Sequence, residues 1–211
     1  MKEYKLPIGC DVPETIILAD GDFPSHPLAL EWLRQCPYVV CCDGAANTYI
    51  RSGRMPEAIV GDGDSLLPGI KERYASLIHS EAEQETNDLS KAFRFCLSQE
   101  RKRITIMGAT GKREDHTIGN VSLLADYMEQ AEVSMMTDYG IFVPIREDSM
   151  FESYIGQQIS VFNMNSTALS AEGLAYPLSV FTNWWQGTLN EALAKHFIIR
   201  TEGKVLVFRV F

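Results

Sequence analysis

The fold of this chain is decided by residues 58–66, which read Ala-Ile-Val-Gly-Asp-Gly-Asp-Ser-Leu. The apolar start of this stretch predicts a short buried strand, and a glycine precedes each of the two aspartates. Glycine lets the backbone turn sharply and lets a ligand approach closely. Side chains at i and i+2 of an extended segment point the same way, so Asp62 and Asp64 can share one target.

Two neighbouring carboxylates repel each other unless a proton or a cation lies between them. Carboxylate oxygens suit Mg²⁺, which usually takes one or two carboxylates together with waters and substrate phosphates. The alternative is an ordinary turn with two solvated acids, because Asp and Gly are common turn residues. Other stretches of the chain favour the metal site.

Three more apolar runs, at residues 15–19, 38–42 and 103–107, predict buried strands. The first two runs are followed directly by Asp-Gly, at Asp20 and Asp43. The third leads into a glycine-rich loop at 108–116. Helical patterns alternate with the strands, at residues 28–36, around Tyr49, from a cap at Thr86 or Asn87, and at 117–128. This alternation predicts an α/β, Rossmann-like, mostly parallel sheet with helices on both faces. Ligands of such sheets bind beyond the carboxyl ends of the strands, where these acids and glycines meet.

The pattern changes at Tyr139, after which short strands alternate with turns, and a helix is expected only around 190–194. We therefore predict two domains, an α/β domain at 1–138 and a small all-β, sandwich-like domain at 139–211. A β domain of this size is marginally stable alone. It is expected to lean on the first domain or on its own copy, so we predict a homodimer joined mainly through residues after Tyr139.

Composition narrows the class of protein. The 211 residues are 45% hydrophobic and 22% charged, which is ordinary for a globular protein. The net charge of −9 argues against nucleic-acid binding, which needs a basic surface. No apolar signal core or membrane-spanning stretch is present, so no membrane association is expected. The five cysteines lack metal-binding or redox spacing, which predicts a reducing compartment, the cytoplasm.

Several short motifs follow one another along the chain. They are, in order, Asp43-Gly-Ala-Ala-Asn47, Gly61-Asp-Gly-Asp-Ser65, Asn87-Asp-Leu-Ser-Lys-Ala92, Gly108-Ala-Thr-Gly-Lys-Arg-Glu-Asp-His-Thr117 with Asn120, Gly173-Leu-Ala-Tyr-Pro-Leu178 and Gly187-Thr-Leu-Asn190. Together these motifs resemble the thiamine pyrophosphokinase family, in its bacterial type. The resemblance implies transfer of a diphosphate group from ATP to thiamine, giving thiamine diphosphate and AMP. Such transfer relies on positioning and charge neutralisation.

The resemblance also implies roles for individual residues. Mg²⁺ would be held by Asp62, Asp64 and Asp88, and one of these or Asp115 would accept the hydroxyl proton. ATP would be bound by Asp43, Gly44, Asn47, Asp64, Lys91, Gly108, Gly111, Arg113, His116 and Asn120. Thiamine would be bound by Tyr176, Thr188 and Asn190.

Two departures stand out. The family usually has Phe where this chain has Gly63, and Ser where it has Leu189. Two alternative functions stay open at this point. One is a diphosphokinase acting on another alcohol, such as a hydroxymethylpterin, which would lack the Gly173–Leu178 stretch. The other is a non-catalytic nucleotide- or thiamine-binding protein, against which the retained Asp62, Asp64 and Asp88 argue.

Overall fold

The computed structural model describes residues 1–7, 12–80 and 85–211. Contacts within the chain divide it into two compact units. The first, called the α/β unit below, comprises Val12–Leu123 and Gln130–Asp138. The second, the β unit, comprises the N-terminal segment, Leu124–Glu129 and Tyr139–Phe211.

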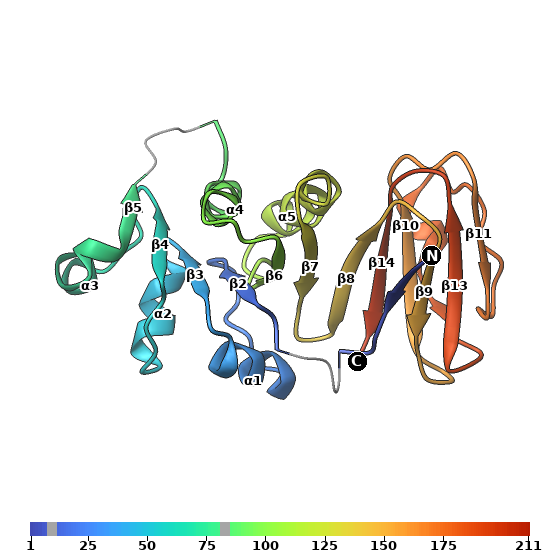
Figure 1. Cartoon of the computed structure of the whole chain (residues 1–211), viewed down its shortest axis with the longest axis horizontal. Helices are drawn as coiled ribbons and strands as arrows, with labels where there is room; N and C mark the ends of the chain where they lie inside the picture. Colours follow the sequence, from blue (N-terminus) through green and yellow to red (C-terminus); the bar gives the residue numbers. More distant parts are fainter. Residues whose placement is uncertain (8–11, 81–84) are drawn as a thin grey trace. The chain divides into compact units, whose positions relative to one another are not determined.

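The α/β unit is built on a parallel sheet (Figure 1). Every neighbouring pair within it is parallel, in the order β7-β6-β2-β3-β4-β5. The strands are β2 (Thr15–Leu18), β3 (Val39–Cys42), β4 (Ala58–Gly61), β5 (Ile78–Ser80), β6 (Arg103–Met107) and β7 (Glu132–Met136). All residues of β2, β3 and β4 are buried, which is why these strands are continuous apolar runs. The predicted parallel sheet is confirmed.

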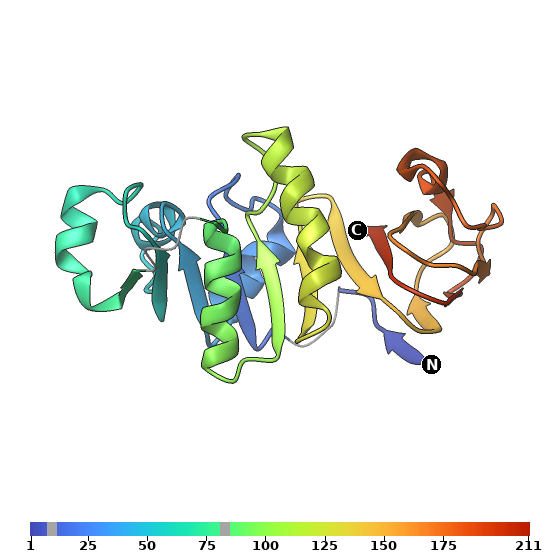
Figure 2. The same cartoon turned by 90° about the horizontal axis from the view of Figure 1, so that it is seen from above.

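Helices cover both faces of this sheet. Their bounds are α1 (Pro27–Gln35), α2 (Ala45–Arg51), α3 (Pro68–Arg73), α4 (Asp88–Ser98) and α5 (Glu114–Tyr127), with a 3₁₀ turn η1 (Ala75–Leu77). The helices α1 and α2 lie on one face, and α4 and the start of α5 lie on the other (Figures 1 and 2). The side chain of Asn87 caps α4 by accepting a hydrogen bond from the Ser90 amide at 2.9 Å. The helix α3 was not predicted, because none of its residues is buried and it carries no apolar stripe.

The order of the strands creates a switch point between β2 and β6. From β2 the chain builds outward through β3 and β4 to β5, then returns to place β6 on the other side of β2. Beyond the carboxyl ends of these two strands, the Gly21 amide donates to the Gly108 carbonyl at 2.6 Å and the Asp22 amide to the Thr110 carbonyl at 2.9 Å. In sheets of this class a crevice for ligands forms at such a point.

The β unit contains two sheets. The first has the order β1-β9-β13-β11, from β1 (Lys2–Tyr4), β9 (Ser149–Glu152), β13 (His196–Thr201) and β11 (Leu169–Glu172). The second has the order β12-β10-β14-β8, from β12 (Asn190–Glu191), β10 (Gln158–Asn163), β14 (Val205–Val210) and β8 (Gly140–Ile145). One apolar core draws on both, including Phe151 and Phe197 from the first sheet and Val161 and Val207 from the second. The predicted sandwich-like architecture is confirmed.

Two details of the β unit differ from expectation. Residues 190–194 form no helix, since Asn190–Glu191 is the short strand β12 and the nearest helical turn is the 3₁₀ helix η2 (Trp184–Gly187). In addition β1 pairs in parallel with β9, so the start of the chain belongs with the β unit. The Tyr4 ring stacks on Phe151 with centroids 4.8 Å apart, which fixes β1 there. A division into domains at 138/139 stays a prediction.

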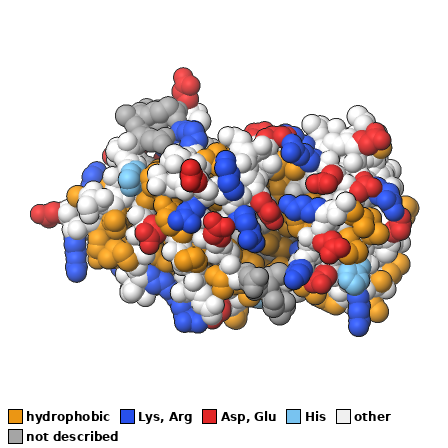
Figure 3. Space-filling view, in the orientation of Figure 1, with side chains coloured by type: hydrophobic (Ala, Val, Ile, Leu, Met, Phe, Trp, Pro, Cys, Tyr) orange, Lys and Arg blue, Asp and Glu red, His pale blue; other side chains and the backbone are white. Residues whose placement is uncertain are grey.

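Charges of both signs are mixed over the face of the molecule drawn in Figure 3. Within the residues that the structure describes, no helix combines the length and the hydropathy that a membrane crossing requires.

Candidate active site at the carboxyl ends of the parallel strands

Asp43 follows β3 and is 3% exposed. Its φ of +24° lies at the edge of the left-handed region, which Asp and Asn adopt more readily than most residues. One carboxylate oxygen accepts a hydrogen bond from the Ser65 amide at 3.0 Å. The other, Oδ1, is buried and accepts none from the described residues. Burial raises the pKa of Asp43, and the carboxylates of Asp88 and Asp62 raise it further.

The turn after β4 places Asp62 and Asp64 at the next strand end. The Asp64 amide donates to Oδ1 of Asp62 at 3.1 Å, so the turn itself orients the first carboxylate. Both side chains are exposed. Gly63 between them is buried and has a φ of +77°, a left-handed conformation that glycine adopts without strain.

Asp88 is the first residue of α4, and its carboxylate is held by a buried lysine. The Lys91 ammonium lies 3.1 Å from Oδ1 of Asp88, and the Lys91 side chain is 5% exposed. A lysine is rarely this buried unless it is paired. The pair therefore places a positive charge beside Asp88, the same acid whose negative charge raises the pKa of Asp43.

These acids suit a magnesium ion in donor chemistry. The buried, unpartnered Oδ1 of Asp43 and the electrostatic effect of Asp62 and Asp88 on Asp43 mark a concentration of negative charge that a cation would neutralise. In the described part of the chain, however, no three acids, histidines or cysteines already stand together as a ligand cluster. An ion held here would therefore draw its remaining ligands from water and phosphate, as Mg²⁺ commonly does.

The loop after β6 approaches β2 closely because of its glycines. A Cβ atom at Gly108 would lie 2.6 Å from the Ala19 carbonyl oxygen, and one at Gly111 would lie 2.1 Å from a carboxylate oxygen of Asp22. Gly44 is equally confined, since a Cβ there would meet a carboxylate oxygen of Asp20 at 2.5 Å. A larger residue at 108 would push against the backbone at the end of β2, and larger residues at 44 and 111 would displace the side chains of Asp20 and Asp22.

Lys112 ties this loop to the end of β2. Its ammonium donates to the backbone carbonyl of Asp20 at 2.8 Å and to its carboxylate at 3.1 Å. Lys112 has a φ of +54°, where a non-glycine residue is strained. Asp20, Asp22 and Lys112 were not predicted as site residues. The signal available was the repeat of Asp-Gly-Asp at 20–22 and 62–64.

Arg113 donates two hydrogen bonds to the carboxylate of Asp115. Nε lies 3.0 Å from Oδ1 and Nη2 lies 2.5 Å from Oδ2, and both side chains are well exposed. This bidentate contact lowers the pKa of Asp115 to about 2. A carboxylate of such low basicity is a weak proton acceptor for as long as the pair lasts.

Two asparagines that we expected to touch ATP act as backbone clamps in this structure. Asn47 donates to the Ser65 carbonyl at 2.8 Å and accepts from the Leu67 amide at 3.0 Å, which fixes the segment after Asp64. Asn120 donates to the Ala109 carbonyl at 2.8 Å and accepts from Asn87 at 3.1 Å, which joins the glycine loop to the cap of α4. Direct contact of either side chain with ATP stays a prediction.

The predicted thiamine-binding residues lie in the β unit. Tyr176 is 63% exposed, whereas Asn190 is 4% exposed and hydrogen-bonds the Tyr176 backbone. The Thr188 hydroxyl donates to the Trp185 carbonyl at 2.7 Å. Leu189 has a φ of +64° and is 77% exposed. The exposed ring is therefore carried by a segment that a buried amide holds. Elsewhere, His116 is exposed in the first turn of α5.

Two models of known protein families match parts of this chain. The model of the thiamin pyrophosphokinase catalytic domain matches residues 29–136, about half of the chain. The model of the thiamin pyrophosphokinase substrate-binding domain matches residues 140–208. The chain belongs to the thiamin pyrophosphokinase family. The catalytic-domain match spans Asp43, Asp62, Asp64, Asp88 and the glycine loop after β6, and the substrate-binding match spans Tyr176, Thr188 and Asn190.

Individual members of the thiamin pyrophosphokinase family are distant in sequence. Thiamine pyrophosphokinase 1 of Oryza sativa subsp. japonica is 30% identical over 129 residues, covering 49% of each chain. Thiamine pyrophosphokinase of Bacillus subtilis is 34% identical over 86 residues, covering 39% of this chain and 40% of that one. The chain thus spans about half the length, or less, of the curated relatives it matches.

Solved structures share the fold over almost the whole chain. Thiamine pyrophosphokinase from Bacillus subtilis superposes with a TM-score of 0.77 at 21% identity, covering 93% of this chain and 98% of that one. Thiamin pyrophosphokinase from Candida albicans superposes with a TM-score of 0.80 at 18% identity, covering 100% and 93%.

Proposed function

We propose that this chain transfers a diphosphate group from ATP to thiamine, giving thiamine diphosphate and AMP. The observation that carries the proposal is the meeting of Asp43, the Asp62–Asp64 turn and the Asp88–Lys91 pair at the carboxyl ends of parallel strands. It lies within the stretch that matches the family's catalytic domain. Acids arranged in this way suit the binding of a metal-bound polyphosphate.

In this reaction the thiamine hydroxyl oxygen bonds to the β-phosphorus of ATP, and the bond from that phosphorus to the oxygen bridging to the α-phosphorus breaks. AMP leaves with the bridging oxygen. Asp62, Asp64 and Asp88 would hold Mg²⁺, which supplies charge neutralisation on the phosphates when bound. Lys91 holds Asp88 in place from the buried side.

Arg113 and Asp115 offer a route for the hydroxyl proton. While Arg113 grips Asp115, the pKa of that carboxyl stays at about 2. Phosphate oxygens of ATP compete for the same guanidinium fork, because Arg binds phosphate and carboxylate alike in bidentate fashion. Transfer of Arg113 to ATP would return Asp115 towards the ordinary pKa of Asp, about 3.9. Asp115 would then accept the proton more readily, with Asp62, Asp64 and Asp88 as the alternatives.

In the β unit we propose that Tyr176 packs against the aromatic rings of thiamine. Thr188 and Asn190 complete the proposed thiamine site. An exposed aromatic face suits a flat pyrimidine and a cationic thiazolium ring. Its exposure of 63% supports a role other than filling the core.

We also propose that the chain forms a homodimer through residues after Tyr139. Several large apolar side chains of the β unit are exposed, among them Tyr139, Ile155, Trp185 and Leu189. Light scattering at micromolar concentration should give twice the chain mass, and a monomer would contradict the proposal. The cytoplasm is the proposed compartment, supported by the free thiols of Cys36, Cys41, Cys42 and Cys96.

The decisive assay incubates the protein with ATP, Mg²⁺ and thiamine and separates the products. AMP and thiamine diphosphate in equal amounts are expected. ADP with thiamine monophosphate would contradict diphosphate transfer. Product formed with a hydroxymethylpterin and none with thiamine would move the activity to another alcohol. Binding of thiamine without turnover would indicate a non-catalytic protein.

A further inference from the structure

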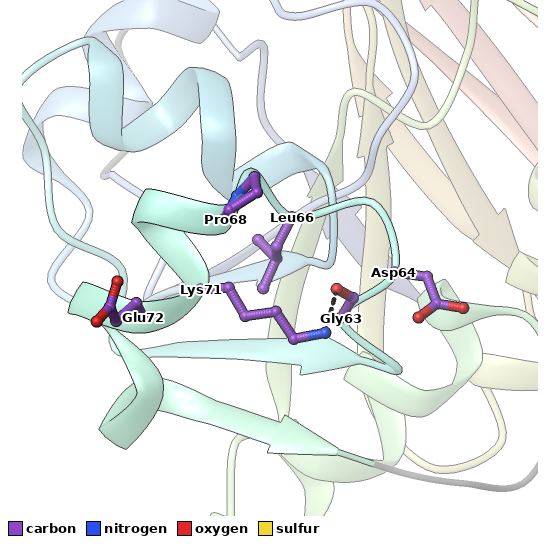
Figure 4. Close-up of a pocket in the computed structure, with 6 residues that line it drawn as sticks. All are labelled: Gly63, Asp64, Leu66, Pro68, Lys71 and Glu72. Carbon is purple, nitrogen blue, oxygen red and sulfur yellow. Dashed lines mark hydrogen bonds between the residues drawn. The ribbon is translucent and has the colours of Figure 1, made fainter.

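Lys71 contacts the acidic turn from a helix that no motif singles out. It lies on α3, and its ammonium donates a hydrogen bond to the Gly63 carbonyl at 2.8 Å (Figure 4). It lines a cavity of about 450 Å³ together with Gly63, Asp64, Leu66, Pro68 and Glu72. With the described residues Lys71 forms no ion pair, so the carbonyl is its polar partner there.

The carbonyl that Lys71 contacts and the amide that orients Asp62 belong to one peptide group. The peptide between residues 63 and 64 accepts from Lys71 at its oxygen and donates from the Asp64 nitrogen to Oδ1 of Asp62 at 3.1 Å. Because a peptide group is planar, rotation of this plane would break both hydrogen bonds together. Hydrogen bonds in such a chain polarise one another, so the ammonium also strengthens the amide as a donor.

Gly63 makes this contact possible in two ways. Its φ of +77° turns the backbone into the left-handed region, where other residues are strained. A Cβ at this position would also lie 3.1 Å from the Lys71 ammonium nitrogen and 3.3 Å from its Cε. A residue with a side chain here would make the end of Lys71 shift by a few tenths of an ångström, so glycine at 63 leaves the ammonium free to reach the carbonyl.

We propose that Lys71 is a positioning residue for the Asp62 carboxylate, acting through the peptide between Gly63 and Asp64. This inference rests on the proposed function, in which Asp62 is a ligand for Mg²⁺. Lys71 fixes the peptide plane, the peptide amide fixes Oδ1 of Asp62, and the second oxygen of Asp62 is left for the metal.

Electrostatic repulsion between the ammonium and a bound cation acts in the opposite direction. Two observations favour positioning as the larger effect. The Lys71 ammonium hydrogen-bonds the carbonyl end of the peptide, whereas Asp62 is bound at the amide end. In addition Asp64 extends away from Lys71 (Figure 4). Among the described residues the ammonium is therefore bonded to the backbone and forms no ion pair with either carboxylate.

The test compares Lys71→Met, which removes the hydrogen bond, with Lys71→Arg, which keeps a charged donor. Glu72→Gln is the matched control, because Glu72 lines the same cavity from the next position of α3. Mn²⁺ replaces Mg²⁺, and binding is followed by electron paramagnetic resonance in the presence of a non-hydrolysable ATP analogue. Lys71→Met should bind Mn²⁺ about tenfold more weakly than wild type, the usual effect of removing a group that orients a ligand. Lys71→Arg should recover most of the affinity, and Glu72→Gln should match wild type.

Thermal unfolding of each variant is measured alongside, and Lys71→Met should unfold near the wild-type temperature because the side chain is exposed. Wild-type Mn²⁺ affinity in Lys71→Met would overturn the inference, as would an equal loss in Glu72→Gln. If the wild type binds Mn²⁺ yet forms no thiamine diphosphate, the proposed function fails while the Mn²⁺ comparison still decides the role of Lys71. A wild type that binds no Mn²⁺ would overturn both.

Discussion

Asn190 holds the backbone of Tyr176 at both ends. Its Oδ1 accepts from the Tyr176 amide at 3.1 Å, and its Nδ2 donates to the Tyr176 carbonyl at 2.8 Å. The same Oδ1 also accepts from the Glu191 amide at 2.9 Å. Because the side chain is almost fully buried, these bonds are shielded from water. Asn190 is therefore built to set the position of an exposed aromatic ring 14 residues earlier in the chain.

Replacing Tyr176 by Ala tests whether the ring binds thiamine. Removal of a stacking surface should weaken thiamine binding by about 1–3 kcal/mol, judged from aromatic stacking elsewhere. ATP binding should hardly change, since its proposed site lies in the α/β unit. Calorimetric titration with each ligand separately measures both values. Equal losses for the two ligands would mean that Tyr176 supports the fold.

Replacing Asn190 by Ala separates positioning from direct contact. The substitution leaves buried backbone groups of Tyr176 unpaired, which should destabilise the protein by about 1–3 kcal/mol. Thiamine binding should weaken as well, because the ring is no longer held. In a Tyr176→Ala background the same substitution should have little further effect on thiamine affinity. A double-mutant cycle measures this coupling, and additive losses would show that Asn190 contacts thiamine itself.

Replacing Asp62 or Asp64 by Asn tests the proposed metal site. An amide keeps the shape of the carboxylate but removes the charge that a divalent cation needs, so turnover should be abolished in each variant. Both side chains are exposed, so the free energy of unfolding should stay within about 0.5 kcal/mol of the wild-type value. Wild-type turnover with unchanged Mg²⁺ dependence in either variant would remove that residue from the site.

Lys112 offers a paired test of strain and function. Lys112→Ala and Lys112→Gly both remove the hydrogen bonds to Asp20, but only glycine relieves the left-handed backbone. The glycine variant should be more stable than the alanine variant by about 1 kcal/mol. Both should lose ATP affinity to the same extent, because both free the loop that carries Arg113. Denaturant unfolding and ATP titration measure the two effects, and equal stability of the two variants would contradict the strain argument.

The sheet of the α/β unit is predictable from sequence because its burial is continuous. In β2, β3 and β4 every residue is buried, so the apolar runs define the strands almost to the residue. The turn acids follow those strands directly and were found in the same way. The cap of α4 was found because Asn87 precedes an amphipathic stripe, and Asn87 does bond the Ser90 amide.

Contacts that join distant segments could not be predicted in this way. Lys71 lies on α3, which buries no residue and so leaves no periodic signal, although Pro68 at its start is a typical first helical residue. The pairing of β1 with β9 joins Lys2 to Ser149, which no local pattern indicates. The roles of Asn47, Asn120 and Asn190 depend on partners 11–33 residues away. The sequence therefore marks these asparagines as polar residues of the motifs and does not show whether they bind a ligand or hold the backbone.

Asp43 makes a prediction about stability and pH. Burial raises its pKa above the unfolded value, and the charges of Asp88 and Asp62 add to the rise. The folded protein therefore prefers the protonated carboxyl, and this contribution to stability is lost as the pH rises through the folded pKa. Asp43→Asn removes the buried charge, keeps an acceptor for the Ser65 amide and tolerates the positive φ. Without divalent metal, the variant should unfold at a higher temperature than wild type at pH 7.

The difference in unfolding temperature should shrink as the pH falls from 7 towards about 4, because Asp43 becomes protonated in the folded protein over this range and carboxyls of ordinary pKa follow near its lower end. Circular dichroism melts at pH 7 and pH 4 measure it, with Glu72→Gln as the control for loss of an exposed carboxylate. Asp43→Asn should also bind Mn²⁺ more weakly than wild type, because the buried negative charge of Asp43 destabilises the fold but would attract the cation. A lower unfolding temperature at pH 7 would mean that Asp43 is already neutral or paired in the folded protein, and Asp43 would then add no negative charge beside the proposed metal ligands Asp62, Asp64 and Asp88.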